Sequence, residues 1–294
     1  MRQRWILITV LLFLVLWQAG CAVLEREAAM PTAKPSQEAA SSVLVQLGRC
    51  CGDVGSRESF LLGGCCASEL VIYPDGQIIL MEGEYGAYNF VEAELTKDEV
   101  CNLLSQIEAS GFLQITGTGQ LMERDSIYRF DEAAQYSEGA GGYFIQVNGD
   151  PPKAVFIYSR YAEYLVPEVR SVYDLLSRYR PQGVKPYVPE GLLLWASAGG
   201  TTGAEVSPME WPTHLPSLAE LLEGRSEGDV VIEGELASAI WELFNGTLSE
   251  REFIDGGKQY TVIARPLLPH EHDEVQCSCM DSPAPLDAPL PCDK

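Results

Sequence analysis

The 294-residue chain has few histidines, few basic residues and no hydrophobic run long enough to cross a membrane. Three histidines leave little scope for histidine-based acid–base catalysis. Lys and Arg number 20 against 42 Asp and Glu, and a chain with a net charge of -22 repels phosphate, which argues against nucleic acid as its main partner. The longest apolar run, Ile6–Trp17, rises only about 18 Å as a helix, against a hydrocarbon core of about 30 Å.

Familiar catalytic motifs are missing as well. The sequence contains no G-x-S-x-G, S-x-x-K, P-loop or H-E-x-x-H pattern. Acidic residues are plentiful, but their spacing nominates no catalytic pair. We therefore name no catalytic residue, and a carboxylate-based hydrolase stays open as an alternative without assigned residues.

The N-terminus has the pattern of an export signal. Arg2 and Arg4 precede the run Ile6–Trp17, whose length is typical of a signal peptide and predicts one over residues 1–20. Residues 25–42 lack apolar periodicity and predict a flexible tether with an r.m.s. span of about 24 Å, so that residues 21–42 comprise Cys21 and the tether.

The segment Gln18-Ala19-Gly20-Cys21 resembles the lipobox of bacterial lipoproteins. The resemblance implies cleavage before Cys21, which then carries several acyl chains such as palmitate. It places the protein on the cell membrane or outer membrane, held by its lipid and facing away from the cytoplasm. An uncleaved anchor helix and a soluble secreted product are the alternatives.

Residues 43–183 predict an α+β domain, an antiparallel sheet with packed helices. Pro74-Asp75-Gly76 predicts a tight turn between two strands, and Thr96 with Glu99 predicts a capping box at a helix start. The expected strands are Val43–Leu47, Leu70–Tyr73, Gln77–Met81, Tyr143–Val147 and Ala154–Tyr158, and the expected helices start after Thr96 and at Pro167, with a long loop over 116–142.

The motif Leu-Val-Ile-Tyr-Pro-Asp-Gly-Gln, followed by a capped helix ending in Gly111-Phe112, resembles an uncharacterised family of bacterial lipoproteins. The resemblance covers about residues 70–160. It implies a location in the envelope and supplies no catalytic residues.

Residues 184–268 predict a smaller α+β unit that packs against the first domain. Its expected elements are Leu192–Ala196, a short helix from Ser217 to Leu222, Val230–Ile232, the helix Leu236–Phe244, and a hairpin of Glu252–Ile254 with Tyr260–Ala264. Residues 269–294 predict a disordered tail or one pinned by disulfides.

Eight cysteines remain after Cys21, and outside the cytoplasm an even set favours disulfides. The candidates are Cys50, Cys51, Cys65, Cys66, Cys101, Cys277, Cys279 and Cys292. Two doublets bracket a glycine-rich segment, which fits cross-loop bridges, but the sequence does not choose among three connectivities. A thiolate metal site at the doublets is the weaker alternative, because their spacing differs from C-x-x-C.

The tail offers a second set of ligands for zinc or copper, namely His270, His272, Cys277 and Cys279. A metal-binding or thiol-redox protein is therefore the main alternative function, although the sequence requires no cofactor.

Residues 153–187 reverse the acidic character of the chain and are rich in tyrosine. Arginine and tyrosine dominate binding hot spots, so this segment is a candidate docking face for an acidic envelope protein or a polyanionic glycan. The alternative is a solvated helix face with tyrosine rings packed along it. The docking candidates are Arg160, Tyr161, Tyr164, Arg170, Tyr173 and Arg178. The sequence as a whole predicts a lipid-anchored envelope protein with a non-enzymatic binding or structural role.

Overall fold

The computed structural model describes residues 43–50, 66–84, 87–117, 127–129, 141–148, 152–199, 207–271 and Cys292. All of these fall within one compact unit, residues 39–294. The predicted signal peptide, Cys21 and the predicted tether lie outside the described residues.

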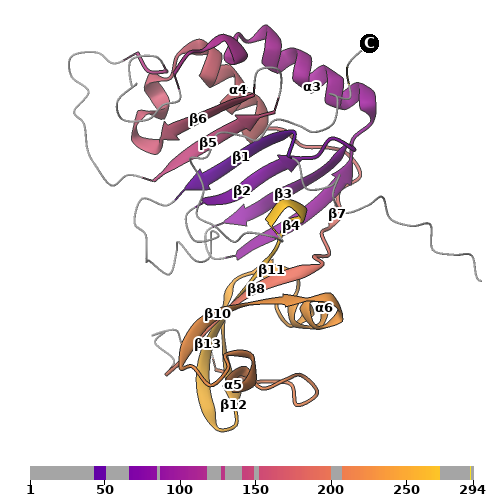
Figure 1. Cartoon of the computed structure of the whole chain (residues 1–294), viewed down its shortest axis with the longest axis vertical. Helices are drawn as coiled ribbons and strands as arrows, with labels where there is room; N and C mark the ends of the chain where they lie inside the picture. The colour runs from indigo at the N-terminus through magenta and orange to yellow at the C-terminus, as the bar shows by residue number, and fades with distance from the viewer. Residues whose placement is uncertain are drawn as a thin grey trace, which may run out of the picture. The chain divides into compact units, whose positions relative to one another are not determined.

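The fold is α+β, as the sequence predicts, and it contains two sheets with packed helices (Figure 1). The first sheet has eight strands in the order β11-β4-β3-β2-β1-β5-β6, with β7 also paired to β4. Its strands are β1 (Val45–Cys50), β2 (Cys66–Ile72), β3 (Gln77–Glu84), β4 (Ala87–Glu94), β5 (Gly142–Val147), β6 (Lys153–Tyr158), β7 (Lys185–Pro186) and β11 (Thr247–Leu248).

The second sheet has five strands in the order β10-β8-β13-β12-β9. These strands are β8 (Gly191–Ala198), β9 (Met209–Glu210), β10 (Glu227–Glu233), β12 (Glu250–Asp255) and β13 (Lys258–Pro266). The short helix α5 (Leu218–Leu221) and the helix α6 (Gly234–Leu243) belong to the same part of the chain. The predicted hairpin is confirmed, with Asp255 paired to Lys258 and both Gly256 and Gly257 at positive φ.

The turn between β2 and β3 forms as predicted, and it needs glycine. Gly76 has φ 97°, and its amide donates to the Tyr73 carbonyl at 3.0 Å. A Cβ on Gly76 would lie 2.4 Å from the Leu95 carbonyl oxygen, so the close approach of a second segment excludes a side chain. Asp75 Oδ1 accepts from the Gln77 amide at 3.1 Å and closes the turn.

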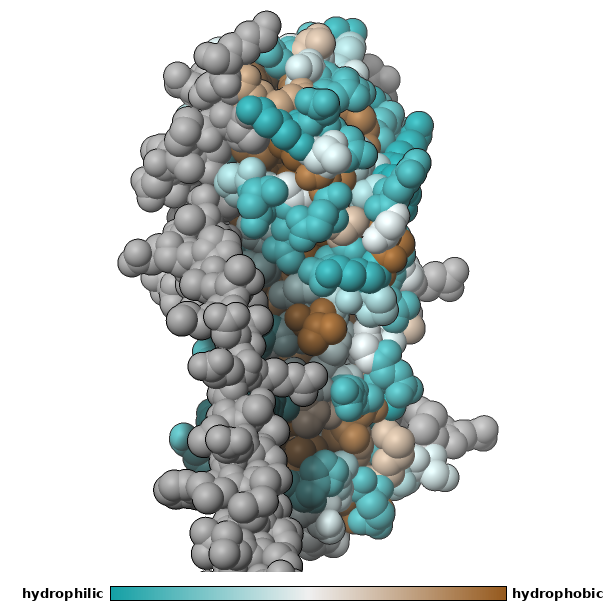
Figure 2. Space-filling model, turned by 90° about the vertical axis from the view of Figure 1, so that its right-hand side faces the viewer, coloured by the Kyte–Doolittle hydropathy of each residue, from teal (hydrophilic) through white to brown (hydrophobic). Residues whose placement is uncertain are grey.

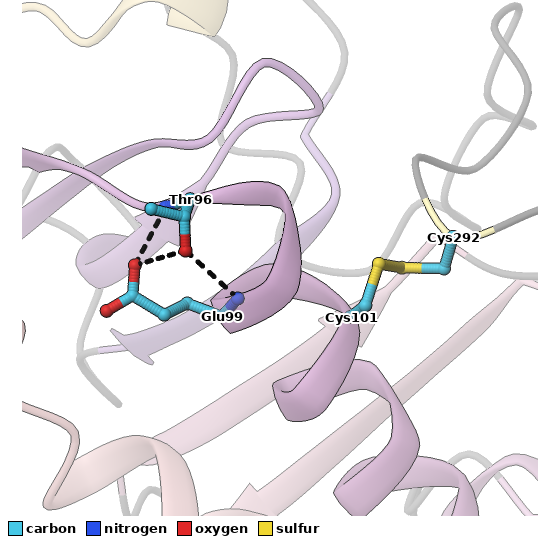
Figure 3. Close-up of a disulfide and its surroundings, with 4 residues drawn as sticks. All are labelled: Thr96, Glu99, Cys101 and Cys292. Atoms are coloured by element: carbon cyan, nitrogen blue, oxygen red, sulfur yellow. Dashed lines mark hydrogen bonds between the residues drawn. A yellow bond between two sulfur atoms is a disulfide. The ribbon is translucent and has the colours of Figure 1, made fainter.

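The capping box at the start of α3 (Lys97–Ala109) is also confirmed (Figure 3). The Thr96 amide donates to Glu99 Oε2 at 2.8 Å, and the Glu99 amide donates to Thr96 Oγ1 at 3.3 Å. The Thr96 hydroxyl also donates to Glu99 Oε2, at 2.7 Å. The bonds from the Thr96 amide and hydroxyl hold the pKa of Glu99 below its ordinary value, because both favour the ionised carboxylate. The helix ends where Gly111 adopts φ 82° before the short η2 (Phe112–Gln114).

Helix α4 (Pro167–Ser177) begins at a proline, as predicted, and buries Val169, Val172 and Leu176. The short η4 (Ser159–Tyr164) leads into it from β6. Helices α3 and α4 lie on the same side of the first sheet (Figure 1).

Both faces of the first sheet are buried in its middle. On β2, Leu70 and Ile72 join the core beneath α3 and α4, while the intervening Val71 joins the core that contains the second sheet. On β3, Ile79 belongs to the core that contains the second sheet, whereas the residues on either side of it belong to the core beneath the helices. Side chains alternate between the faces of a strand, so continuous apolar runs here mean two covered faces.

The segment 184–268 packs against the segment 43–183 through this second core. Its buried residues include Leu194, Trp241 and Phe244 of the later segment with Tyr88 and Phe90 of β4. Strands β7 and β11 also pair with β4, so the later segment contributes strands to the first sheet.

A disulfide joins Cys101 of α3 to Cys292, which confirms two of the predicted disulfide cysteines (Figure 3). The bridge spans 191 residues of sequence. It fixes the C-terminal end of the chain to a helix near the beginning of the folded part.

On the face drawn in Figure 2, hydrophobic side chains appear in separate groups among hydrophilic ones. Across the described residues, the exposed large hydrophobic side chains are Val184, Val188, Met209 and Val231. In the part of the chain that the structure describes, no helix has the length and apolar character needed to span a bilayer.

We expect the double substitution Cys101→Ser/Cys292→Ser to lower the free energy of unfolding by about 2–5 kcal/mol, because the bridge restricts the unfolded chain over a long loop. Urea unfolding followed by circular dichroism measures this change. Ser105→Ala on the exposed side of α3 is the control. Equal stability of the double variant and the unmodified protein in oxidising buffer would contradict the prediction.

Candidate functional site

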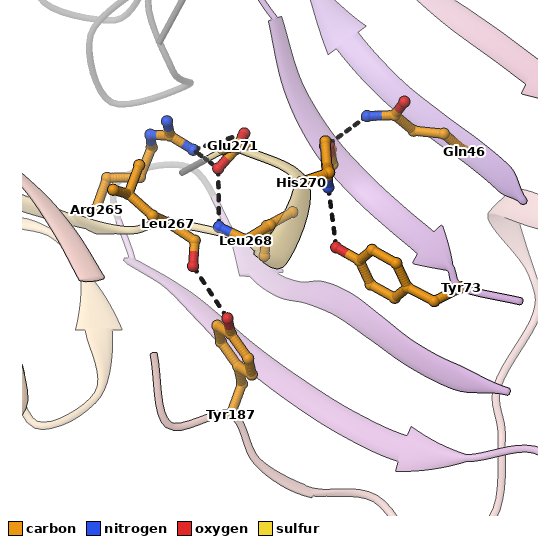
Figure 4. A network of polar contacts seen from close by, with 9 residues as sticks. Gln46, Tyr73, Tyr187, Arg265, Leu267, Leu268, His270 and Glu271 are labelled. Atoms are coloured by element: carbon orange, nitrogen blue, oxygen red, sulfur yellow. Dashed lines mark hydrogen bonds and ion pairs between the residues drawn. The ribbon is translucent and has the colours of Figure 1, made fainter. Parts of the chain in front are cut away.

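A cluster of polar side chains lies where the end of β13 meets the first sheet (Figure 4). We call it the C-terminal network, and it consists of Tyr73, Tyr187, Arg265, His270 and Glu271. Tyr73 directly follows β2 and Tyr187 directly follows β7, whereas the other three come from β13 and from η5 (Pro269–Glu271). The network therefore joins residues of the two sheets.

Arg265 and Glu271 form a largely buried ion pair. Arg265 is 4% exposed, and its Nη1 donates to Glu271 Oε1 at 3.0 Å and to Oε2 at 2.8 Å. Glu271 Oε2 also accepts from the Leu268 amide at 2.9 Å. Burial alone would raise the pKa of Glu271, but Arg265, His270 and the Leu268 amide outweigh it and hold this pKa below its ordinary value.

The two tyrosines hold the same segment from the side of the first sheet. The hydroxyl of Tyr187 donates to the Leu267 carbonyl at 3.0 Å, and the hydroxyl of Tyr73 lies 2.9 Å from His270 Nδ1. Burial, with smaller contributions from Tyr187 and Glu271, raises the pKa of Tyr73 well above its ordinary value. The hydroxyl of Tyr73 thus keeps its proton, and the protonation and tautomer of His270 decide which of the two groups donates. Gln46 of β1 lies beside His270 in Figure 4 and donates to Ser68 Oγ at 2.6 Å.

This arrangement is suited to fastening rather than to proton transfer. The two tyrosines hold the segment Leu267–Glu271 against the ends of β2 and β7, whereas Glu271 bonds back to Arg265 and to the Leu268 amide within β13 and η5. Leu267 and Leu268 are themselves buried. The ionised pair needs its full set of partners, because an uncompensated charge at this depth is costly.

Of the predicted metal set, the structure describes His270 alone, so the set stays a prediction. His270 contacts Tyr73, whereas His272, Cys277 and Cys279 lie outside the described residues. Across the residues that the structure describes, no three His, Cys, Asp or Glu side chains are grouped so that they could hold a metal ion.

The remaining cysteines are placed only in part. Cys50 and Cys66 pair in the backbone register of β1 and β2. Cys51 and Cys65, like the lipid-attachment candidate Cys21, lie outside the described residues. Their roles stay predictions.

The predicted docking residues do not form one exposed face. Tyr161 is 5% exposed and packs its ring against Tyr128 in the core, so it is unavailable to a partner, and this part of the prediction is wrong. Tyr173 is half-buried, with its ring 5.2 Å from that of Tyr143. Tyr164 is half-buried, and the side chain of Arg160 lies outside the described part.

The two predicted docking arginines at α4 differ in exposure, and Arg178 is the C-cap residue that follows the helix. The side chain of Arg178 is 79% exposed and lies 3.7 Å from Asp174, while Arg170 is half-buried one turn before Asp174. Arg180 and Lys185 lie close to Glu82 and Glu92, respectively. Acids of the same protein thus compensate part of the basic charge that the sequence shows in this segment.

Sequence reasoning missed the ion pair of Arg265 with Glu271. A charged residue inside the apolar run Tyr260–Leu268 was the available signal, because buried charges are almost always paired. It also missed Arg49, which lies 2.5 Å from Glu69 and stacks over the ring of Tyr143. That contact joins β1, β2 and β5 and has no local sequence signal.

Comparisons with known proteins add no family or relative: no protein-family model, curated protein or solved structure matches this chain.

We expect Glu271→Gln to lower the free energy of unfolding by about 3–5 kcal/mol, because it leaves Arg265 buried without a counter-charge. The double variant Arg265→Met/Glu271→Leu should recover most of this loss. Denaturant unfolding at pH 7 measures both changes, and a single variant as stable as the unmodified protein would contradict the prediction.

The same pair gives a pH dependence of known sign. The pKa of Glu271 is lower in the folded protein than in the unfolded chain. The stability that ionised Glu271 contributes is therefore fully present at a pH above its pKa in the unfolded chain. It is lost as the pH falls through its pKa in the folded protein. The stability gap between the unmodified protein and Glu271→Gln should therefore narrow on acidification below the ordinary glutamate pKa.

If Arg170 and Arg178 dock a polyanion, the variant Arg170→Glu/Arg178→Glu should lose retention on immobilised polygalacturonate at low salt. The melting temperature of this variant should not fall. Lys97→Glu/Lys258→Glu, with both lysines exposed and outside α4, carries the same change in charge and should be retained like the unmodified protein. Equal retention of the arginine variant would rule out this docking face.

Proposed function

We propose that the protein is a lipid-anchored component of the bacterial cell envelope, and that its folded part has a binding or structural role rather than a catalytic one. The observation that carries this proposal is the position of Cys21. It follows Ala19-Gly20 at the end of an apolar run that is preceded by Arg2 and Arg4. Cleavage before this cysteine would place the lipid at the start of the mature chain.

The disulfide between Cys101 and Cys292 supports export. Stable disulfides belong to oxidising compartments, such as the bacterial periplasm and the cell surface, and they are rare in the cytoplasm. A signal for export and a bridge in the folded part are independent features that agree on the same compartment.

The charge of the chain supports attachment through the lipid. A net charge of -22 is repelled by anionic lipid headgroups, so the protein surface does not supply the attraction that a basic patch would. One acyl chain alone binds a membrane only marginally, whereas a multiply acylated cysteine supplies stable anchoring. The membrane is therefore the partner that this proposal names first, and another envelope protein or a polyanionic glycan is the second.

A metal-binding or thiol-redox function of the C-terminal tail is the alternative. It depends on His272, Cys277 and Cys279, which lie outside the described residues. Of the four predicted ligands the structure describes His270, whose Nδ1 contacts the Tyr73 hydroxyl. A carboxylate-based hydrolase has no assigned residues.

The test is metabolic labelling of bacteria with a palmitate analogue, followed by separation of membranes from soluble proteins. The unmodified protein should carry the label and sediment with membranes, whereas Cys21→Ala should lose the label. Cys101→Ser should keep it, because that cysteine belongs to the folded part. Label that persists in Cys21→Ala, or a soluble unlabelled parent protein, would overturn the proposal.

A further inference from the structure

Strands β1 and β2 bring one cysteine of each doublet into register. In the antiparallel ladder, Cys50 is the partner of Cys66, and the preceding pairs are Arg49 with Ala67 and Gly48 with Ser68. Directly opposed residues in antiparallel strands have Cα atoms about 4.5–5.5 Å apart, within the range of about 4.4–6.8 Å that a disulfide requires.

A β-bulge determines which cysteines meet. Leu47 pairs with Leu70, but Gly48 pairs with Ser68, so Glu69 is the extra residue of β2. Without this extra residue the ladder would run on in step, and Cys50 would face Ala67 instead of Cys66. Glu69 forms an ion pair with Arg49 of the neighbouring strand.

The register is fixed on both sides of β1. The strand also pairs with β5, where Leu47 meets Ile145 and Cys50 meets Gly142. Leu47 is 1% exposed and Ile145 is fully buried beneath the helices. A slip of one residue would turn this buried row toward the opposite face of the sheet, so the pairing of Cys50 with Cys66 is tied to burial of the core.

We propose that Cys50 and Cys66 form a cross-strand disulfide. Of the three connectivities open to the two doublets, this pairing excludes Cys50 with Cys51 and Cys50 with Cys65. The bond forms when the two thiols lose two protons and two electrons to a disulfide oxidant, which is reduced to two thiols. The inference rests on the proposed function only in that the envelope supplies such an oxidant.

Trypsin can separate the two doublets, because Arg49 and Arg57 bracket the first and Lys97 ends the peptide that contains the second. The full-length protein is refolded in detergent with reduced and oxidised glutathione, and its free thiols are alkylated before digestion. The variant Cys51→Ser/Cys65→Ser should give peptides 50–57 and 58–97 joined as one mass that is lost on reduction. The crossed variants Cys51→Ser/Cys66→Ser and Cys50→Ser/Cys65→Ser should give separate, alkylated peptides.

The link between Cys101 and Cys292, found in the same digest, reports whether each variant has folded. Separate alkylated peptides from a folded Cys51→Ser/Cys65→Ser variant would overturn the proposal. The proposal would also be overturned if the crossed variants joined the two peptides as completely, because the strand register would then not select which cysteines pair. Glutathione supplies the oxidant in this experiment, so failure to acylate Cys21 in cells leaves its result unchanged.

Discussion

Burial of the first sheet on both faces is the constraint on which the rest of the structure depends. Leu70, Ile72 and Leu80 face the helices, while Val71 and Ile79 face the second sheet. If the register of a strand with two covered faces shifts by one residue, its two apolar rows change places, and side chains packed in one core must fit the other. The helices and the second sheet are therefore both needed to keep β2 and β3 in place. The segments 43–183 and 184–268, which the sequence predicts as separate units, fold around a shared core. The same reasoning fixes β1, and with it the backbone position of Cys50 opposite Cys66.

The later segment also closes an edge of this sheet. On its outer side β4 pairs with β11 at Tyr88 and Asn89 and with β7 at Val91 and Glu92. Unpaired strand edges invite association with other chains, and two short strands cover this one. The C-terminal network joins the segment after β13 to the residues that follow β2 and β7. The disulfide joins Cys292 to α3. These contacts reach from the last strand back to the first elements of the fold.

Local chemistry was readable in the sequence where a few neighbouring residues decide the outcome. The capping box of Thr96 with Glu99 and the turn at Gly76 are of this kind, because their hydrogen bonds close within three or four residues. Strand β4 was missed although its burial alternates, since its mixture of small, polar, apolar and charged residues resembles a loop unless its partners are known. Strand β11 has two residues and exists only because β4 offers an edge. Long-range pairing of this sort leaves no mark in a local pattern.

The candidate sites, too, depend on long-range packing that a local pattern does not show. Composition alone grouped the tyrosines of residues 153–187, but it could not tell which side of an element each one occupies. Tyr161 lies in the core against Tyr128, and Tyr173 packs on Tyr143, which in turn lies beneath Arg49 of β1. These rings serve the packing of η4 and α4 on the sheet. They leave Arg178 exposed at the end of α4 and Arg170 half-buried within it. A binding role for that surface then depends on charge more than on aromatic contact, and Asp174 already offsets part of that charge. Any partner must compete with this internal acid, so docking there would be weak, salt-sensitive and suited to a polymer that makes many contacts at once.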